Sequence, residues 1–455
     1  MQYPSNSRFK SDSVAILRLA TPLVGGQIAV VGMTVTDIYM AGQYSVEALA
    51  AVQLGGNIWS MITLLIIGIM IGNNPIIGNY WGARQLAKLR SQFQQVVWLA
   101  VPMGFAAALG VLLGIFILSQ LEISDQVFSI ARDYLLPYLF TALLLPTFYA
   151  FRSTFEGVGD TRPVLVFNSI AFALNLVLDY ALVFGKLGAP ELGGAGAGWA
   201  TLLVMLFLLA CVAIYARVSR TLRDIDLYRH FGRPQLQHML KTLAIGVPIA
   251  LNIGAEFGFF AVIPLLIAHL GPTVIGAHAV AINIDSLAFM VPLSIAQALT
   301  ILVAQAEGRG DSETARRICL TGFKIVFLLA LVLSALKVLL RHDLAGLFSA
   351  EPEITRLAAD LFLFAAVLGC VDCLQIACSG ALRGFQDVKV PLLIQVVAFW
   401  VIAFPIAYSL ALTDYWGSAW GVKGFWLGMI IAASCASIGL LARWYYVAAR
   451  VVARG

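Results

Sequence analysis

Asp37 is the first residue that can do chemistry inside a long apolar run. It lies in the segment Val31-Gly-Met-Thr-Val-Thr-Asp37-Ile-Tyr39-Met-Ala-Gly42, near the end of that run. A charged side chain at membrane depth costs between about 2.5 and more than about 10 kcal/mol. A carboxylate is therefore kept at such a position because it faces a cavity or a partner, which makes Asp37 the starting point of a candidate site.

A polar stripe in the fifth apolar run supplies the partners. Asn168, Asn175 and Asp179 are spaced by seven and four positions, so they share one face of a helix. Asparagine in membranes commonly forms interhelical hydrogen bonds, but an ionisable residue on the same stripe favours a functional site. Thr201 in the next run adds a hydroxyl. With Asp37 these residues offer hard oxygen ligands for Na⁺, or two carboxylates, Asp37 and Asp179, that share one proton.

The second half of the chain carries a different set of acids. Glu256 follows Asn252 by one helical turn, and Asp372 and Gln375 share a face of another run. Asp285 lies in a third run. We predict that Glu256, Asp372 and Asp285 form a second site, for a cation or for a substrate.

Other polar and aromatic residues are candidates for lining a cavity. Hydrogen bonding between helices explains the presence of several of them in the spans equally well, and packing does so for His278. These cavity candidates are Gln53, Asn57, Asn168, Asn252, His278, Asn283, Phe289 and Gln375.

The composition indicates the protein class. The chain has 455 residues, of which 60% are hydrophobic and 12% are charged, whereas soluble domains carry about 25% charged residues. A polytopic, all-α membrane protein is predicted. The six cysteines mostly lie in apolar runs and are interpreted as small packing residues rather than zinc or redox groups. The net charge of +5 comes from short loops between spans, so no nucleic-acid partner is expected.

Twelve apolar runs are long enough to cross a bilayer. They cover roughly residues 14–41, 47–77, 92–119, 127–150, 163–185, 195–216, 240–269, 273–304, 317–340, 355–381, 390–412 and 420–446. Lys and Arg are concentrated in every second loop, and this asymmetry predicts that both termini are cytoplasmic.

The chain also repeats itself with a nearly constant step. Pro22 and Pro248 are 226 positions apart, and so are Asn57 and Asn283. Each half has six spans, so the halves are expected to be parallel six-helix lobes related by a pseudo-two-fold axis along the membrane normal. The predicted division is an amino-terminal domain (1–216), a cytoplasmic linker (217–239) and a carboxy-terminal domain (240–455). Under this repeat Asp37 aligns with Ile263, so the scaffold is duplicated and the acids are not.

No nucleotide-binding motif is present. The glycine-rich segment 193–198 follows no strand and lacks a Lys-Ser/Thr sequence, so it is interpreted as a tight turn. The chain is therefore expected to use no cofactor, and the energy for any transport would come from a coupling ion, H⁺ or Na⁺.

The motifs together resemble the multidrug and toxic compound extrusion (MATE) transporters of the NorM-like branch. The resemblance covers nearly the whole chain. It is carried by Asp37 in its segment, Glu156-Gly-Val-Gly-Asp160-Thr-Arg-Pro163, Asn175-x3-Asp179, Glu256 in Asn252-Ile-Gly-Ala-Glu256-Phe, residues 289–298, Gly308-Arg-Gly-Asp311, and Asp372 ahead of Gly380-Ala-Leu-Arg-Gly384.

The resemblance implies a function for these residues. It implies cation-coupled export of cationic, amphipathic compounds by alternating access, with the positions of Asp37, Asn175, Asp179 and Thr201 tied to the coupling cation. It also implies a monomer in a bacterial inner membrane, in contact with lipids. A flippase for a lipid-linked precursor remains the alternative, although its anionic substrate would need a basic cavity. An intramembrane enzyme is disfavoured because the acids lack protease motifs.

Overall fold

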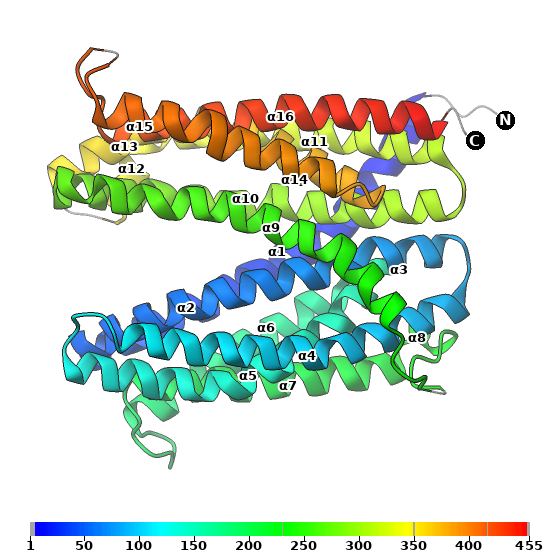
Figure 1. Ribbon diagram of the computed structural model, residues 1–455, viewed down its shortest axis with the longest axis horizontal. Coiled ribbons are helices and arrows are strands. Elements are labelled where there is room, and N and C mark those ends of the chain that lie inside the picture. The colour runs from blue at the N-terminus through cyan, green and yellow to red at the C-terminus, as the bar shows by residue number, and fades with distance from the viewer. Residues whose placement is uncertain (1–4, 230, 349–350, 416, 453–455) are drawn as a thin grey trace. The chain divides into compact units, whose positions relative to one another are not determined.

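The computed structural model describes residues 5–229, 231–348, 351–415 and 417–452, and every regular element in these ranges is a helix (Figure 1). Twelve of the described helical segments are long and apolar enough to span a membrane. They agree closely with the predicted runs; the run expected at 163–185, for example, is the helix Arg162–Phe184. The prediction of an all-α, multi-pass membrane protein is confirmed.

Eight helices form the first half of the chain. They are α1 (Ser5–Tyr44), α2 (Val46–Ile71), α3 (Asn73–Gly82), α4 (Leu86–Leu118), α5 (Asp125–Gly157), α6 (Arg162–Phe184), α7 (Gly194–Val218) and the short α8 (Arg220–Arg223). The helices α2 and α3 together make one span.

The second half follows the same plan. It contains α9 (Leu236–Ile267), η1 (Ala268–Leu270), α10 (Pro272–Gly308), α11 (Ser312–Leu339), α12 (Arg341–Gly346), α13 (Pro352–Gly384), α14 (Lys389–Val396), the π-helix η2 (Val397–Ala403), α15 (Phe404–Leu412) and α16 (Val422–Val452). The segments α14, η2 and α15 form one span.

The helix boundaries reproduce the repeat seen in the sequence. The helices α2 and α10 begin at residues 46 and 272, and α4 and α11 begin at residues 86 and 312, a step of 226 in both cases. The step is 227 for the starts of α5 and α13 at residues 125 and 352, and 228 for α7 and α16 at residues 194 and 422. Equivalent positions in the two halves can therefore be read directly from the numbering.

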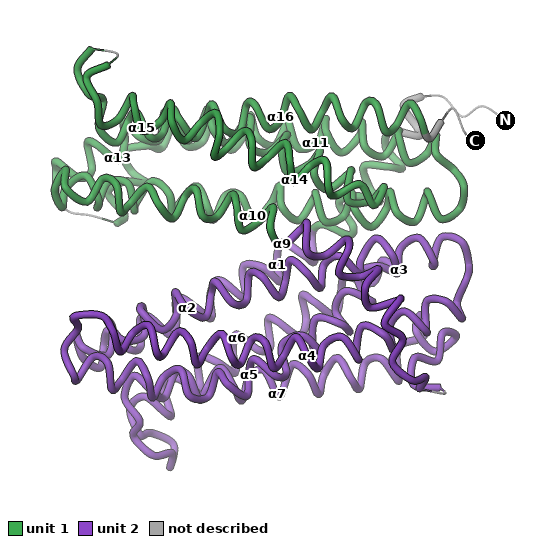
Figure 2. Tube along the Cα trace, viewed as in Figure 1, with its two compact units in different colours: residues 1–20, 251–455 green, residues 21–250 purple. Residues whose placement is uncertain are grey.

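The chain forms two compact units (Figure 2), which we call the amino lobe (residues 21–250) and the carboxy lobe (residues 1–20 and 251–455). The helices α1 and α9 each contribute to both lobes, and the divisions lie next to Pro22 and Pro248. Proline lacks a backbone N–H and permits a helix to bend, which suits a point where a helix leaves one packed unit for the other.

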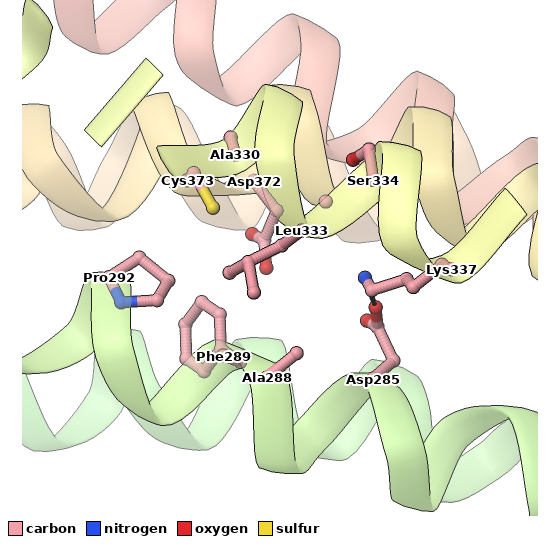
Figure 3. A pocket seen from close by; sticks show the side chains of 11 residues that line it. Asp285, Ala288, Phe289, Pro292, Ala330, Leu333, Ser334, Lys337, Asp372 and Cys373 are labelled. Carbon is pink, nitrogen blue, oxygen red and sulfur yellow. Dashed lines mark hydrogen bonds and ion pairs between the residues drawn. The ribbon is translucent and has the colours of Figure 1, made fainter. Parts of the chain in front are cut away.

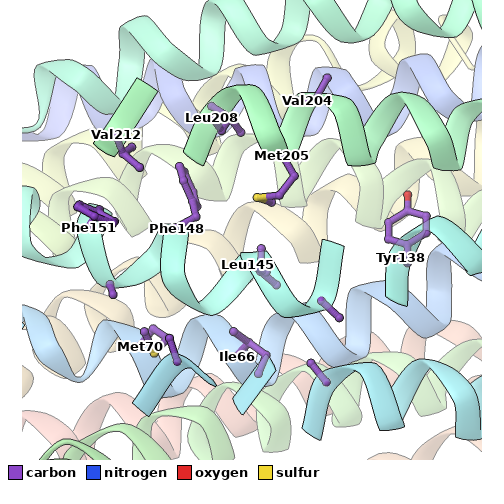
Figure 4. Close-up of a cluster of buried hydrophobic side chains, with 14 of the residues drawn as sticks. Ile66, Met70, Tyr138, Leu145, Phe148, Phe151, Val204, Met205, Leu208 and Val212 are labelled. Atoms are coloured by element: carbon purple, nitrogen blue, oxygen red, sulfur yellow. The ribbon is translucent and has the colours of Figure 1, made fainter. Parts of the chain in front are cut away.

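The core of the amino lobe is built from α2, α4, α5 and α7 (Figure 4). Small residues let the first turns of α9 join this lobe: a Cβ atom at Gly246 would lie 2.2 Å from the carbonyl oxygen of Ile69. Side chains of α4 also fasten the segment predicted as the linker, because Gln94 donates to the carbonyl oxygens of Leu227 and Arg229.

The carboxy lobe has two apolar clusters. One is built mainly from α9, α10, α13, η2, α15 and α16, and the other from α10, α11, α13 and α16. The start of α1 belongs to the second cluster through Ile16 and Leu19, and Asp12 accepts a hydrogen bond from Arg317 Nε at 2.7 Å.

Candidate functional site

The amino lobe brings together the four residues predicted to hold a cation. Asp37 lies on α1 and is 8% exposed. Its Oδ1 accepts a hydrogen bond from Asn175 Nδ2 of α6 at 3.1 Å, and its Oδ2 lies 3.5 Å from the Thr201 hydroxyl of α7. Three helices therefore place amide, hydroxyl and carboxylate oxygens at one point.

Asp179 lies one helical turn after Asn175 and is fully buried. Neither of its carboxylate oxygens has a hydrogen-bond donor among the described residues. The carboxyl groups of Asp179 and Asp37 interact electrostatically with each other. Two buried carboxylates without a cationic side chain cannot both stay ionised at low cost, so the pair requires a shared proton or a bound cation.

Two tyrosines of α5, which the sequence reasoning missed, complete this site. Tyr138 donates to the Thr201 hydroxyl at 3.2 Å, and the hydroxyl groups of Tyr134 and Tyr138 are 2.8 Å apart. Both residues are almost fully buried. Their spacing of four positions places them on one helix face, which is a signal that the sequence does contain.

The donor set fits a small monovalent cation better than a transition metal. The available ligands are oxygens of carboxylate, amide and hydroxyl groups, which suit hard cations. In the described part of the chain no group of three or more His, Cys, Asp or Glu residues is arranged to hold a metal ion. Carboxylate oxygens such as those of Asp37 and Asp179 can bind a hard cation or share a proton.

The carboxy lobe assembles the second set of acids. Asp372 of α13 is 6% exposed, and it interacts electrostatically with Glu256 of α9 and with Asp285 of α10. Glu256 accepts a hydrogen bond from Gln395 at 3.4 Å and faces the buried guanidinium of Arg383. The three predicted acids thus lie in one neighbourhood, but with basic residues among them.

Lys337 of α11 was not anticipated as part of this group. Its ammonium group forms an ion pair with Asp285, and both side chains are largely buried. Figure 3 shows the two groups facing each other, with Asp372 and Phe289 lining the same cavity. The only sign in the sequence is a lysine inside an apolar run, and its partner is 52 positions away.

The remaining cavity candidates are scattered. Gln53, Asn57 and Asn283 are exposed, and Asn283 donates to the carbonyl oxygen of its own helix at Ala279. Asn168 is buried and donates to the Gly26 carbonyl oxygen at 3.2 Å. These positions are compatible with hydrogen bonding within and between helices.

Three further candidates are buried in the carboxy lobe. His278 packs its ring against Trp426. Asn252 is 4% exposed, and Gln375, fully buried, lies beside Glu256. Gln375 and Phe289 are cavity candidates that the structure places next to the predicted acids.

Comparison with known proteins identifies the scaffold. The MatE family model matches the chain twice, over residues 22–181 and again over residues 248–409, which are the two halves of the repeat. The chain belongs to the MatE family. The MatE match also explains why a single pattern of spans and turns occurs twice in the chain.

Curated relatives of this MatE protein cover nearly its whole length. It is 32% identical over 436 residues to the multidrug resistance protein NorM of Aliivibrio fischeri, covering 96% of this chain and 95% of that protein. It is 34% identical over 442 residues to NorM of Vibrio parahaemolyticus, covering 96% of this chain and 97% of that protein.

Solved structures share the fold. An outward-facing multidrug resistance MATE family transporter of the MOP superfamily superposes with a TM-score of 0.86 at 21% identity, covering 96% of both chains. A MATE protein in complex with MaL6 gives a TM-score of 0.87 at 20% identity, covering 97% of both chains.

Proposed function

We propose that this protein is a cation-coupled antiporter that exports cationic, amphipathic drugs and toxic compounds by alternating access. The observation that carries the proposal is the buried acid pair Asp37 and Asp179, which has no cationic side chain opposite it among the described ion pairs. The NorM names of the relatives support multidrug export as the activity.

The acid pair provides a means of exchange. In the inward-facing state ionised Asp37 and its neighbours attract an organic cation from the cytoplasm or the inner leaflet. After the change to the outward-facing state, an external H⁺ or Na⁺ binds Asp37 and Asp179 and reduces their negative charge. The drug then leaves, because a neutralised pair no longer attracts a cation.

The available driving forces are sufficient. A membrane potential of 100 mV supplies about 2.3 kcal/mol for each charge moved, and a tenfold ion gradient supplies about 1.4 kcal/mol. Together these forces sustain one to three decades of drug accumulation, on the order of what efflux requires.

The spans and the relatives support a membrane setting for the proposed antiporter. We place it in a bacterial inner membrane, as a monomer in contact with lipids and with both termini in the cytoplasm. No enzymatic step and no cofactor are assigned to it. The flippase alternative needs an unneutralised basic cavity, whereas the Lys337 charge is balanced by Asp285.

The test is ethidium efflux from vesicles that contain the purified protein, with pH and sodium gradients imposed separately. Wild-type protein is expected to export ethidium under at least one of the gradients, and Asp37→Asn to lose at least nine-tenths of that export. The matched control is Asp343→Asn, which neutralises an exposed acid of the short helix α12. Wild-type efflux from the Asp37→Asn protein would refute the proposal.

A further inference from the structure

The segment that joins α7 to α9 is basic, and the proposed exchange at Asp37 does not use it. We call its described residues 219–229 and 231–235 the basic strap. Its exposed charged residues are Arg220, Arg223, Asp224, Asp226, Arg229 and Arg233. None of these side chains belongs to an ion pair among the described residues. The strap therefore carries an excess of positive charge that no described acid neutralises by pairing.

The backbone of the basic strap is fixed to the amino lobe. Leu222, Ile225 and Leu227 are at most 1% exposed and belong to the apolar core of that lobe. Near the start of α4, Arg90 Nε donates to the Ile225 carbonyl oxygen at 2.8 Å. The strap is thus a packed part of the lobe rather than a loose connection, although its arginine side chains are exposed.

Further side chains of α4 hold the strap in order along the helix. One turn after Arg90, Gln94 donates to the Arg229 carbonyl oxygen at 3.0 Å and accepts from the Gly232 N–H at 3.1 Å. One turn further, Trp98 Nε1 donates to the Gly232 carbonyl oxygen at 2.9 Å. The strap therefore follows α4 from its start as far as Trp98.

Trp98 lies at the boundary of the expected hydrocarbon core. It is 37% exposed and begins a stripe of exposed apolar residues on α4, spaced by three or four positions: Trp98, Val101, Phe105, Leu109, Leu112 and Phe116. Such a stripe is one face of a helix, and in a membrane span an exposed apolar face meets lipid. At about 1.5 Å per residue the stripe is about 27 Å long, close to the roughly 30 Å of the hydrocarbon core. Tryptophan is common at this boundary.

Arg229 and Arg233 therefore lie at the level of the lipid headgroups. Gln95, within one turn of Trp98 on its polar side, donates to the Arg233 carbonyl oxygen at 3.0 Å. Phe231, between the two arginines, is 46% exposed, and its ring meets that of Trp98 edge to face, with centroids 6.0 Å apart. A guanidinium group binds phosphate through two parallel N–H donors, and the exposed rings suit the boundary between headgroups and acyl chains.

The helix plan of the repeat does not require this surface. A step of 226 positions takes Gln94 to Leu320 and Trp98 to Lys324, so α11 carries neither the amide nor the indole that hold the strap. The helices of the carboxy lobe form without them. The arrangement on α4 is therefore better explained by a binding partner than by helix packing.

We propose that the basic strap is a binding surface for the headgroups of anionic phospholipids. Arg229 and Arg233 contact the phosphate groups, and Phe231 and Trp98 lie beside the glycerol and the first part of the acyl chains. The strap follows six spans, so it lies on the same side as the amino terminus, and the leaflet is the one on the proposed cytoplasmic side. The inference goes beyond the proposed function, since lipid binding needs neither a drug nor a coupling ion.

The test is competition between two lipids for purified full-length protein. The protein in detergent is mixed with equal amounts of phosphatidylglycerol and phosphatidylcholine, and the bound lipids are counted by native mass spectrometry. Wild-type protein should retain phosphatidylglycerol at least about threefold over phosphatidylcholine, and Arg229→Gln with Arg233→Gln should bring this ratio close to one. The control, Arg309→Gln with Arg316→Gln, removes the same charge from two exposed arginines of the carboxy lobe and should keep the wild-type ratio.

A second comparison separates a fixed surface from general attraction by positive charge. Gln94→Leu copies Leu320, keeps every arginine and removes the three hydrogen bonds between Gln94 and the strap. On a fixed surface the lipid ratio should fall at least about twofold, whereas attraction by charge alone leaves it unchanged. If Gln94→Leu does not fold, Arg229→Lys with Arg233→Lys makes the same distinction, because lysine keeps the charge without the planar fork.

Several results would overturn the inference. They are equal retention of the two lipids by wild-type protein, an unchanged ratio in Arg229→Gln with Arg233→Gln, and an equal loss in the carboxy-lobe control. An unchanged ratio in the folded Gln94→Leu protein would overturn the fixed surface, and displacement of phosphatidylglycerol by inorganic phosphate would assign the strap to free phosphate instead. Failure of ethidium efflux by wild-type protein would overturn the proposed function and leave these binding results readable.

Discussion

The polar and charged site residues of each lobe correspond to apolar residues at the equivalent positions of the other lobe. The two family matches begin 226 positions apart and end, at residues 181 and 409, 228 positions apart. The repeat thus takes the four amino-lobe residues Asp37, Asn175, Asp179 and Thr201 to Ile263, Ala403, Ala407 and Met429. All four of these counterparts are buried in the apolar core of the carboxy lobe. In the other direction, Asp285, Lys337 and Asp372 correspond to Trp59, Val111 and Leu145, which belong to or pack on the amino-lobe core.

This exchange teaches what belongs to the scaffold and what does not. The same packing of helices forms with Asp179 in the amino lobe and with Ala407 at the equivalent position of the carboxy lobe. Packing therefore does not require an acid at this position. The acids are then best explained by the binding of ligands. The two lobes carry these acids at different positions of the same helical repeat. The lobes also differ in charge, because no described ion pair gives the amino-lobe acids a cationic partner, whereas Lys337 and Arg383 interact with the carboxy-lobe acids.

The largest effect on folding is expected when an acid is placed at an apolar position whose equivalent in the other lobe is an acid. Ile263→Asp puts a carboxylate at the position equivalent to Asp37, inside the apolar core to which Ala403 and Ala407 also belong. A central charged residue costs at least about 2.5 to 3.5 kcal/mol, so little folded protein should be recovered. Ile263→Val is the control and removes one methylene, with a cost of about 1 kcal/mol. The yield and Tm of detergent-purified protein measure both.

The reciprocal change should affect transport more than folding. Asp179→Ala copies the carboxy-lobe residue Ala407 and leaves Asp37 as a lone carboxylate. Ethidium efflux should fall at least tenfold, about 1.4 kcal/mol, while Tm stays close to the wild-type value because an unpartnered buried acid is removed. Asp133→Ala, which removes an exposed acid of the same lobe, serves as the control. Undiminished efflux from Asp179→Ala under both ion gradients would contradict this account.

A smaller effect is expected at the tyrosine that supports the amino-lobe site. Tyr138→Phe removes the hydrogen bonds to Thr201 and to Tyr134 and leaves the aromatic contact with Trp59, whose ring centroid is 4.6 Å away. One neutral hydrogen bond is worth about 1 kcal/mol, so the concentration of coupling cation giving half-maximal efflux should rise about fivefold. No change in that concentration would show that Tyr138 does not orient Thr201.

Sequence reasoning predicts the parts of this comparison that are local. The apolar runs predict the spans, and the constant step between Pro22 and Pro248 predicts the repeat that the helix boundaries follow. The stripe of Asn175 and Asp179 predicts the face that meets Asp37, because a helix fixes which residues share a side.

The partnerships between distant residues could not be predicted in this way. Lys337 meets Asp285 because α10 and α11 turn particular faces toward each other, and Gly369 of α13 leaves space for the ammonium group. Such choices depend on packing between helices, which the periodicity of one helix does not contain. Tyr138 was missed for the same reason, since its role exists only through Thr201 of another helix.

The smallest expected effect concerns the caps of two equivalent helices. Asp311 caps α11, and its side chain accepts a hydrogen bond from the Thr314 backbone N–H at 3.0 Å. Its amino-lobe counterpart, Gln85 before α4, has a similar backbone conformation (φ −89°, ψ 63°, against φ −103°, ψ 74° for Asp311) but no side-chain cap. Asp311→Ala should cost about 1 kcal/mol, and Gln85→Asp should gain a few tenths to about 1 kcal/mol.

The pH dependence of these two variants shows whether the cap acts through a carboxylate. Hydrogen bonding to Thr314 lowers the pKa of Asp311 below its ordinary value, so its contribution to stability is complete above that ordinary value. The contribution is lost as the pH falls through the lowered folded-state pKa. The Tm difference between wild type and Asp311→Ala should therefore be constant near neutral pH and shrink in acid, and the gain from Gln85→Asp should shrink likewise. Gln85→Asn can cap α4 without ionising. If the gain in Tm persists in acid for Gln85→Asn but not for Gln85→Asp, the starts of α4 and α11 have the same backbone conformation and differ only in the side chain at the cap position.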